Sequence, residues 1–327
     1  MTASETTSTD NFDVVIVGGG PTGCSAGVFC AREGLDTLIF DRGRSSIQRC
    51  AHLENYLGFP AGIDIETFYE LIQDHAETAG CEIVPDLVES VERTNDGDGF
   101  RVTPQDGDAV NARRVIAATR YDGEYMRGLD DDAAMFESHE HGGEEHEHFD
   151  REYADHDGTT PVSSLYVASP SEETDSQAIM AAGRGARVAH RVIADVRMDD
   201  GWWQEVAEGV DWVRREAELN DEWSDRDRRI EWFDNHYGED APVDSDSDRF
   251  QRVRSACIDD SMSSYVSPDE IGARAVTGQE SLAAKLDPEH VAAAIDDETL
   301  LEHVDDDQIL AMAETIHTSP KAAGGDE

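Results

Sequence analysis

The first apolar residues of the chain come in short runs that are too brief for helices. Residues 12–17 and 37–41 are rich in β-branched and aromatic side chains, as strands buried on both faces of a parallel sheet are. Between these runs, small residues at 21–33 predict a closely packed helix, which Gly34 ends. The order of strand, glycine turn, helix and strand predicts the start of an α/β fold.

The pattern continues with one more helix and several short strands. Phe68, Leu71, Ile72 and His75 recur at helical spacing and predict a helix over about residues 66–79. Strand-like pieces follow at 82–84, 88–92, 100–103 and 114–118, and the turn at 95–99 separates the middle two. We therefore expect a parallel sheet extended by a three-stranded meander. A strand at 165–168 and a helix over about 175–196 complete this domain.

The remaining segments carry weaker patterns. Residues 121–160 lose apolar periodicity and become acidic and His-rich, so we expect a loop there. From Gly201 the chain looks helical, with a stripe of apolar residues at 202, 206, 210 and 213 and a polar break at 241–248. Near the end, aspartates at 287, 296 and 305 each precede a short apolar run, which predicts N-caps in a bundle of short helices.

These patterns predict a leader and two larger parts. Residues 1–11 are polar and are expected to form a flexible leader, and residues 12–198 are expected to form the α/β domain with its acidic loop at 121–160. Residues 199–327 are expected to form an acidic α-helical extension. Five tryptophans in this extension suggest helices that pack on the first domain or form a homodimer.

The charge is extreme: 26 basic residues stand against 73 acidic ones, for a net charge of −47. Such a chain repels nucleic acid and anionic membranes, so neither is an expected partner. Self-repulsion of this size is largely screened at about 1 M salt, where the Debye length is about 3 Å. The composition therefore predicts a halophilic protein of a salt-rich cytoplasm.

The cysteines and the hydropathy also favour a cytoplasmic location. Cysteines occur at 24, 30, 50, 81 and 257 with no CxxC spacing, which is typical of reduced intracellular thiols. Neither a signal peptide nor a run of about 18 apolar residues is visible. Cys24 and Cys30 are expected in the core. Cys50 is a weak candidate for a catalytic group, and a buried inert thiol is the interpretation we prefer.

One motif carries recognisable chemistry. Gly18-x-Gly20-x-x-Gly23 follows a strand and opens a helix, which is the context of a dinucleotide-binding loop. The helix N-terminus offers free N–H groups and a positive dipole end to a pyrophosphate. Asp41 ends the second strand, where a carboxylate accepts hydrogen bonds from an adenosine ribose.

Two segments resemble the thioredoxin reductase family. The loop Leu53-Glu54-Asn55-Tyr56-Leu57-Gly58-Phe59-Pro60 is similar to the family's loop beneath the flavin ring, and residues 165–169 with 176–183 resemble its second flavin segment. The resemblance implies an FAD cofactor, with Asn55 and Gln177 flanking the flavin. The residues expected to contact FAD are Gly18, Gly20, Pro21, Thr22, Gly23, Asp41, Arg42, Asn55, Val88, Thr119, Arg120, Ser169, Gln177 and Ala178.

The chain also departs from that family. Only about 45 residues separate Thr119 from Ser164, too few for the family's nicotinamide-binding domain, and neither a second GxGxxG nor a CxxC occurs. Arg120 replaces a family glycine and Ser169 a family aspartate. We therefore expect a haloarchaeal-type FAD-binding oxidoreductase that receives electrons from a partner protein or a small diffusible reductant. A non-catalytic nucleotide-binding or redox-sensing module is the alternative, and an NAD enzyme is a third possibility.

The His-rich segment has the residue types of a metal site. His139, His141, His146 and His148 alternate with glutamates, and imidazoles with carboxylates suit zinc, nickel or copper. A metal site needs fixed geometry, however, and this stretch shows neither periodicity nor an apolar scaffold. We therefore favour a solvated acidic loop that covers the cofactor, with the four histidines as weaker metal candidates.

Overall fold

The structure is a computed structural model that describes residues 11–95, 97–120, 122–141, 144–169, 177–210, 213–219, 224–239 and 241–318, without the side chains of 139–146 and 316–318. By its contacts the chain divides into two compact units, Met1–Ile271 and Gly272–Glu327. The domain boundary predicted at 198/199 coincides with the end of a long helix, α4 (Ala178–Asp199), and stays a prediction.

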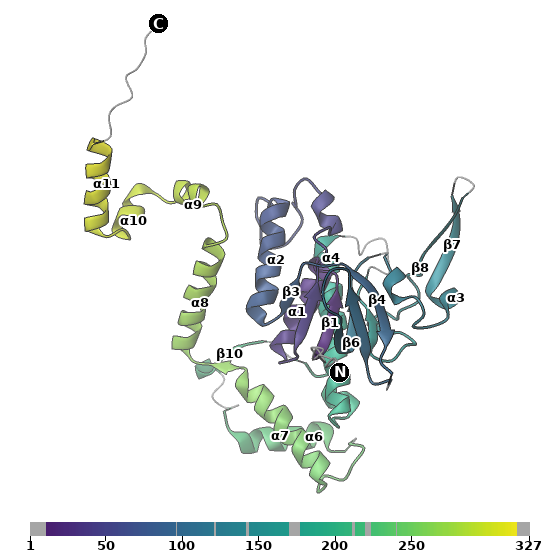
Figure 1. Ribbon diagram of the computed structural model, residues 1–327. Coiled ribbons are helices and arrows are strands. Elements are labelled where there is room, and N and C mark those ends of the chain that lie inside the picture. Colours follow the sequence, from purple (N-terminus) through teal and green to yellow (C-terminus); the bar gives the residue numbers. More distant parts are fainter. Residues whose placement is uncertain are drawn as a thin grey trace, which may run out of the picture. The chain divides into compact units, whose positions relative to one another are not determined.

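Seven strands form one mixed sheet in the first unit (Figure 1). Its parallel part has the order β3 (Glu82–Val84), β2 (Thr37–Phe40), β1 (Asn11–Val17) and β6 (Val110–Ala117). The second edge of β6 is shared, because its first half pairs antiparallel with β5 (Phe100–Pro104) and its second half pairs parallel with β9 (Leu165–Val167). Antiparallel β4 (Val88–Arg93) completes the meander. The predicted α/β Rossmann-like fold with its three-stranded meander is confirmed.

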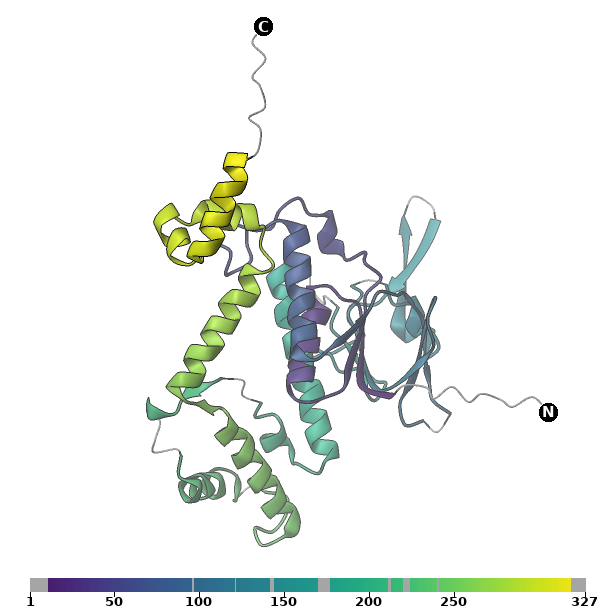
Figure 2. The same cartoon turned by 60° about the vertical axis from the view of Figure 1, so that its left-hand side comes forward.

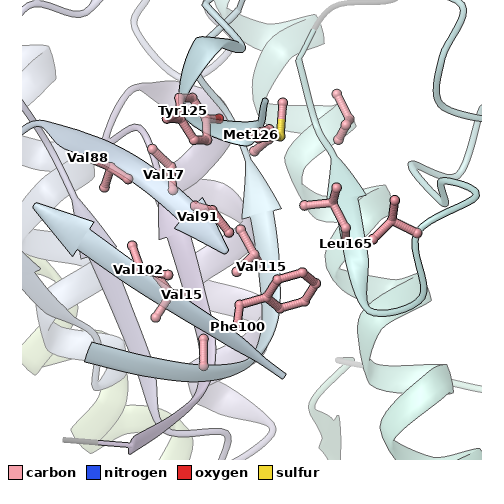
Figure 3. Packing of buried hydrophobic residues seen from close by; sticks show 14 of the residues in the cluster. Val15, Val17, Val88, Val91, Phe100, Val102, Val115, Tyr125, Met126 and Leu165 are labelled. Atoms are coloured by element: carbon pink, nitrogen blue, oxygen red, sulfur yellow. The ribbon is translucent and has the colours of Figure 1, made fainter. Parts of the chain in front are cut away.

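The two faces of the sheet bury two separate apolar clusters. Val15 and Val17 of β1 pack with residues of the meander and of β9, as Figure 3 shows. Val14 and Ile16 point to the opposite face, because successive side chains of a strand alternate. That face is covered by α1 (Pro21–Arg32), which lies between α2 (Ile65–Ala79) and α4 (Figures 1 and 2).

Helices α1 and α4 approach each other very closely. A Cβ atom on Gly185 of α4 would lie 2.0 Å from the carbonyl oxygen of Thr22, so only glycine fits at this crossing. Helix α2 is fixed at both ends, since Asp64 accepts a 2.8 Å hydrogen bond from Thr67 N–H and Gly80 ends the helix in the left-handed conformation, at φ 113°. These contacts hold the three helices that surround the glycine-rich turn.

The expectation of a loop over 121–160 was wrong. This segment contains η2 (Glu124–Met126), α3 (Asp132–Met135) and an antiparallel hairpin of β7 (Phe136–His141) and β8 (Glu144–Phe149). The two ends of the hairpin, Phe136 and Phe149, are buried in the cluster of Figure 3 and meet edge to face. The residues between them are polar, so the alternation of apolar and polar residues that predicts a strand is missing from the sequence.

Residues 200–266 build a smaller apolar cluster at the end of α4. Its elements are α5 (Gln204–Ala207), β10 (Arg215–Glu216), α6 (Arg226–Tyr237), α7 (Asp248–Ser263) and β11 (Tyr265–Val266). The predicted helical stripe from Trp202 to Val213 was wrong, because helix α5 is only one turn long and Val213 is 56% exposed. Trp203 stacks on Phe250 instead, and Phe233 packs beside both rings.

The C-terminal helices are α8 (Pro268–Ala283), α9 (Pro288–Ala294), α10 (Asp297–Glu302) and α11 (Asp306–Thr318). The predicted N-caps are confirmed, since Asp287, Asp296 and Asp305 each accept a hydrogen bond from a backbone N–H two or three residues later. The expected bundle is not seen, because none of their described side chains is buried. Within the described ranges, no helix combines the length and the hydropathy needed to cross a membrane.

Candidate functional site

The glycine-rich turn joins the end of β1 to the start of α1. Gly18 has φ 115°, and a Cβ there would lie 2.6 Å from the carbonyl oxygen of Ala118. A Cβ on Gly23 would lie 1.8 Å from the carbonyl oxygen of Gly18, so the helix can pack on the turn only with glycine at this position. The N-cap of α1 is Gly20, no side chain caps the helix, and its first turn carries no acidic residue. The first N–H groups of α1 therefore suit an anion.

A cleft of about 500 Å³ opens over this turn, at the carboxyl ends of β1, β2 and β6. Ligands of open α/β sheets bind at such a switch point, and the volume falls within the range of small-molecule sites. Most residues that the sequence predicts as cofactor contacts line the cleft, namely Gly18, Gly20, Pro21, Thr22, Asp41, Arg42, Val88, Thr119, Arg120, Gln177 and Ala178.

The other three predicted contacts, Gly23, Asn55 and Ser169, do not line the cleft. Asn55 donates a 2.7 Å hydrogen bond from Nδ2 to Oε1 of Gln177, which does line the cleft. Gly23 lies beneath the glycine turn. Ser169 is buried, and its carbonyl oxygen accepts a 2.7 Å hydrogen bond from Nε of Arg184. The two segments expected on either side of a flavin thus meet, although 122 residues separate Asn55 from Gln177.

Asp41 is held by neighbours that the sequence did not suggest. Its Oδ2 accepts hydrogen bonds of 2.6 Å from the Tyr69 hydroxyl and 2.6 Å from Nε2 of Gln73, both on α2. Its Oδ1 accepts a 3.1 Å hydrogen bond from Gly43 N–H. Burial, followed by the hydrogen bond to Asp41, raises the pKa of Tyr69 well above its usual range. Asp41 therefore ties β2 to α2, and its predicted role as a ribose acceptor stays a prediction.

Four arginines line the cleft, in a chain that carries 73 acidic residues. Arg42 pairs with Asp122 at 3.1 Å, and Arg120 comes from the loop after β6. Sequence reasoning missed Arg44 and Arg49, which lie just before and at the end of η1 (Ser46–Arg49). Three arginines, at 42, 44 and 49, follow closely after the second strand, and this pattern could have predicted that Arg44 and Arg49 lie at the cleft. Guanidinium groups suit phosphate oxygens in charge and geometry.

Arg120 has an unusual backbone conformation, with φ 69°. This left-handed region favours glycine, because a Cβ crowds the following carbonyl group there. The conformation agrees with the family resemblance, which places a glycine at this position. The arginine therefore keeps a glycine-type turn in the lining of the cleft and adds a cation to it.

The expectation that Cys50 is a buried thiol was wrong, because Cys50 is exposed and lines the cleft. It directly follows η1, where it forms the C-cap of that short helix. Cys24 and Cys30 are buried in the core, as predicted, and Cys81 joins them. Burial raises the pKa of the Cys24 and Cys81 thiols to about 12, so they stay protonated at neutral pH.

The histidines lie on the β7–β8 hairpin. The side chains of His139, His141 and His146 are outside the described part of the structure, so their predicted role as metal ligands is not tested there. His148 is described, and its Nε2 lies 3.2 Å from Oε1 of Glu137. Among the side chains that the structure does describe, no group of three or more His, Cys, Asp or Glu residues could hold a metal ion.

The parallel sheet, the uncapped helix and the cleft over the glycine turn are features of a Rossmann-like domain. Residues 16–54 match the family model of an NAD(P)-binding Rossmann-like domain. Thioredoxin reductase from Streptomyces clavuligerus is 34% identical over 110 residues, which cover 33% of this chain and 34% of that protein. The Bacillus subtilis enzyme is 32% identical over 110 residues, or 33% of each chain. The fold is thus Rossmann-like, and 110 residues of the chain are similar in sequence to thioredoxin reductases.

The matched part spans about a third of the length of these curated relatives. Among solved structures, a thioredoxin reductase from Gloeobacter violaceus is similar, with 16% sequence identity and a TM-score of 0.47, over 63% of this chain and 98% of that one.

Proposed function

We propose that this protein binds FAD and acts as an FAD-dependent oxidoreductase. One observation carries the proposal: the phosphate-binding turn and the two segments expected beside a flavin line a single cleft, joined by the hydrogen bond between Asn55 and Gln177. The N-terminus of α1 and the arginines would hold the pyrophosphate, and Gln177 would flank the flavin. When bound, FAD would supply the redox chemistry, while the chain's own residues orient it and limit its exposure to water.

We further propose that electrons come from a partner protein or a diffusible reductant. Support comes from the sequence, which contains neither a second GxGxxG nor a CxxC. The described residues between β6 and β9 form η2, α3 and the β7–β8 hairpin, with no second parallel sheet among them. A nicotinamide would then lack a site from which to pass hydride rapidly to the flavin.

A visible absorption spectrum of the protein purified in molar KCl tests the first proposal. Bound FAD gives flavin bands, and colourless protein should take up added FAD with return of those bands. A folded protein that binds no FAD would refute the proposal. The electron route is tested by anaerobic mixing with stoichiometric NADPH, which should bleach the flavin slowly or not at all, whereas dithionite should bleach it fully.

A second candidate is a non-catalytic nucleotide-binding module. It is favoured by Asp41, whose carboxylate is already held by Tyr69, Gln73 and Gly43. It is also favoured by Ser169, which is buried and does not line the cleft. This candidate predicts that ADP binds as tightly as FAD, because only the adenylate half would contact the protein. If FAD binds clearly more tightly than ADP, the flavin half contacts the protein, and the first proposal holds.

A further inference from the structure

A smaller pocket lies near the end of α4, away from the nucleotide cleft. Its volume is about 260 Å³, which leaves room for a ligand smaller than those of most small-molecule sites. The first turn of α4 lines the cleft through Ala178 and Ala181, whereas Asp195, Met198 and Asp199 line this pocket. At a rise of about 1.5 Å per residue, Ala181 and Asp195 are about 20 Å apart along the helix. The two sites are therefore separate.

Arg114 of β6 is a buried cation that lines this pocket. Only 8% of its side chain is exposed, yet among the described residues its one hydrogen-bond partner is Asp199, which accepts from Nη2 and is itself 73% exposed. A guanidinium group has five N–H donors, and a buried charge is costly unless it is well paired. None of its other nitrogens is sealed in the protein without a partner. The remaining N–H groups of Arg114 are therefore available to a ligand.

Two serines line the pocket on the turn that leads into β9. The turn is held by its backbone, since the carbonyl oxygen of Ser163 accepts a 2.5 Å hydrogen bond from Nη2 of Arg93, and that of Ser164 accepts one of 3.0 Å from Val115 N–H. Ser164 has φ 64°, a left-handed conformation that residues other than glycine rarely adopt. Among the described residues, neither serine hydroxyl has a hydrogen-bond partner. Two hydroxyl groups can therefore add to the donors of Arg114.

Two carboxylates supply the opposite charge. Asp195 and Asp199 are four residues apart on α4 and so lie on one face of the helix. Oδ2 of Asp195 accepts a 2.6 Å hydrogen bond from the Tyr166 hydroxyl, and Oδ1 pairs with Arg191. Oδ1 of Asp199 has no hydrogen-bond partner in the described part of the chain. An acceptor for a cationic group thus lies directly beside the donors of Arg114.

We propose that this pocket binds a small α-amino acid with an aliphatic side chain. In such a molecule a carboxylate and an ammonium group are attached to one carbon atom, and Arg114 and Asp199 are in contact, so the two charges of the pocket are equally close. The ligand carboxylate would accept hydrogen bonds from Arg114 and the serine hydroxyls. The ligand ammonium would donate hydrogen bonds to Asp199 and Asp195.

The rest of the lining limits the choice of ligand. Val162, Leu165 and Met198 form its apolar part, which suits a short aliphatic side chain. A simple anion is disfavoured by the two carboxylates, and a simple cation by Arg114. Because no residue that lines this pocket also lines the nucleotide cleft, the proposal does not depend on FAD.

Calorimetric titration of the full-length protein in molar KCl at pH 7.5 tests the proposal. The probes are L-alanine, L-valine and L-leucine, and the controls are acetate and ethylammonium chloride, which each carry only one of the two charged groups. We expect one molecule per chain for at least one amino acid, bound about tenfold or more tightly than either control. Absence of binding by all three amino acids would overturn the proposal, as would equal binding of acetate or ethylammonium.

The decisive variant is D199N, which keeps an oxygen that can accept from Arg114 but removes the charge that faces the ammonium group. It should weaken amino-acid binding by about tenfold or more and should not weaken acetate binding. The matched control is D200N, because Asp200 is the next residue, is exposed and does not line the pocket. Unchanged binding in D199N, or an equal loss in D200N, would refute the proposal. If D199N lowers the melting temperature of the ligand-free protein, S164G takes its place, since glycine accepts φ 64° and only the hydroxyl is lost.

Discussion

Arg197 and Glu33 form a partly buried ion pair that joins α4 to the residue after α1, with Nη2 of the arginine 2.7 Å from Oε1 of the glutamate. The same guanidinium pairs with Asp260 of α7 at 2.9 Å and lies over the ring of Trp202. One side chain thus connects the Rossmann-like domain to the smaller apolar cluster of Trp203, Phe233 and Phe250, called here the Trp203 cluster. Burial raises the pKa of Glu33, while Arg197 opposes that rise.

Arg197→Met should destabilise the protein by about 2 to 4 kcal/mol, because it leaves the partly buried Glu33 carboxylate without its cation. The loss should shrink as pH falls, since a Glu33 pKa raised further in the variant lets the native state take up a proton that removes the charge. Urea denaturation in molar KCl at pH 5 and 7.5 measures both effects. The double variant E33Q/R197M should recover part of the loss, and a pH-independent loss would contradict this explanation.

Arg44→Ala and Arg49→Ala should each weaken FAD binding by about fivefold or more, because both arginines line the cleft and add positive charge near the phosphates. The effect should shrink as KCl rises, since salt screens exposed charges. Fluorescence titration with FAD at several KCl concentrations provides the measurement. Arg101→Ala, at an exposed position on β5, is the control and should bind FAD as the unsubstituted protein does.

Arg120→Gly should leave the fold as stable as before or slightly more stable, because glycine adopts φ 69° without a steric cost, and this gain offsets its greater freedom when unfolded. If Arg120 contacts phosphate, FAD affinity should fall by about 1.5 to 3 kcal/mol, the usual contribution of a hydrogen bond to a charged group. Equilibrium FAD titration and melting curves of both proteins provide the test. Tighter FAD binding by the glycine variant would show that the arginine obstructs the cofactor.

Stability should fall as pH rises above about 8.5. Burial raises the pKa of Cys24 and Cys81 to about 12 and raises that of Tyr166 above its usual range, whereas unfolded thiols and phenols ionise near pH 8.5 and 10. The unfolded chain therefore binds fewer protons, and each group adds a slope of up to about 1.4 kcal/mol per pH unit. Urea denaturation between pH 7.5 and 11 measures how the free energy of unfolding falls with pH. Cys81→Ala should reduce the slope, and replacing the exposed Cys50 by alanine should not.

The fold should gain stability as KCl rises toward molar concentrations, because a net charge of −47 opposes the compact state and salt screens it. Melting temperatures at 0.1, 1 and 3 M KCl are the measurement. Potassium glutamate at matched ionic strength separates screening from specific chloride binding. A melting temperature that does not change with KCl would count against this prediction.

Local patterns were enough to predict β1, β2, α1 and the glycine turn, because each is set by residues that are adjacent in the chain. The hairpin β7–β8 was missed because its strands are stabilised by pairing with each other and by the anchors Phe136 and Phe149, while their exposed faces are both polar. The partners of Asp41 were missed for another reason. Tyr69 and Gln73 lie 28 and 32 residues away, and only the tertiary fold, in which α2 packs against α1 and β3, brings them to the carboxylate.

Helix α4 has 22 residues and is therefore about 33 Å long. Its first turn lines the nucleotide cleft through Ala178 and Ala181, and its last turn carries Arg197 into the Trp203 cluster. The crossing at Gly185 and Thr22 is too close for the helix to slide or roll there without a clash. We therefore expect that a displacement of the first turn of α4 on nucleotide binding also moves its far end, and that the fluorescence of Trp202 beside Arg197 changes with it.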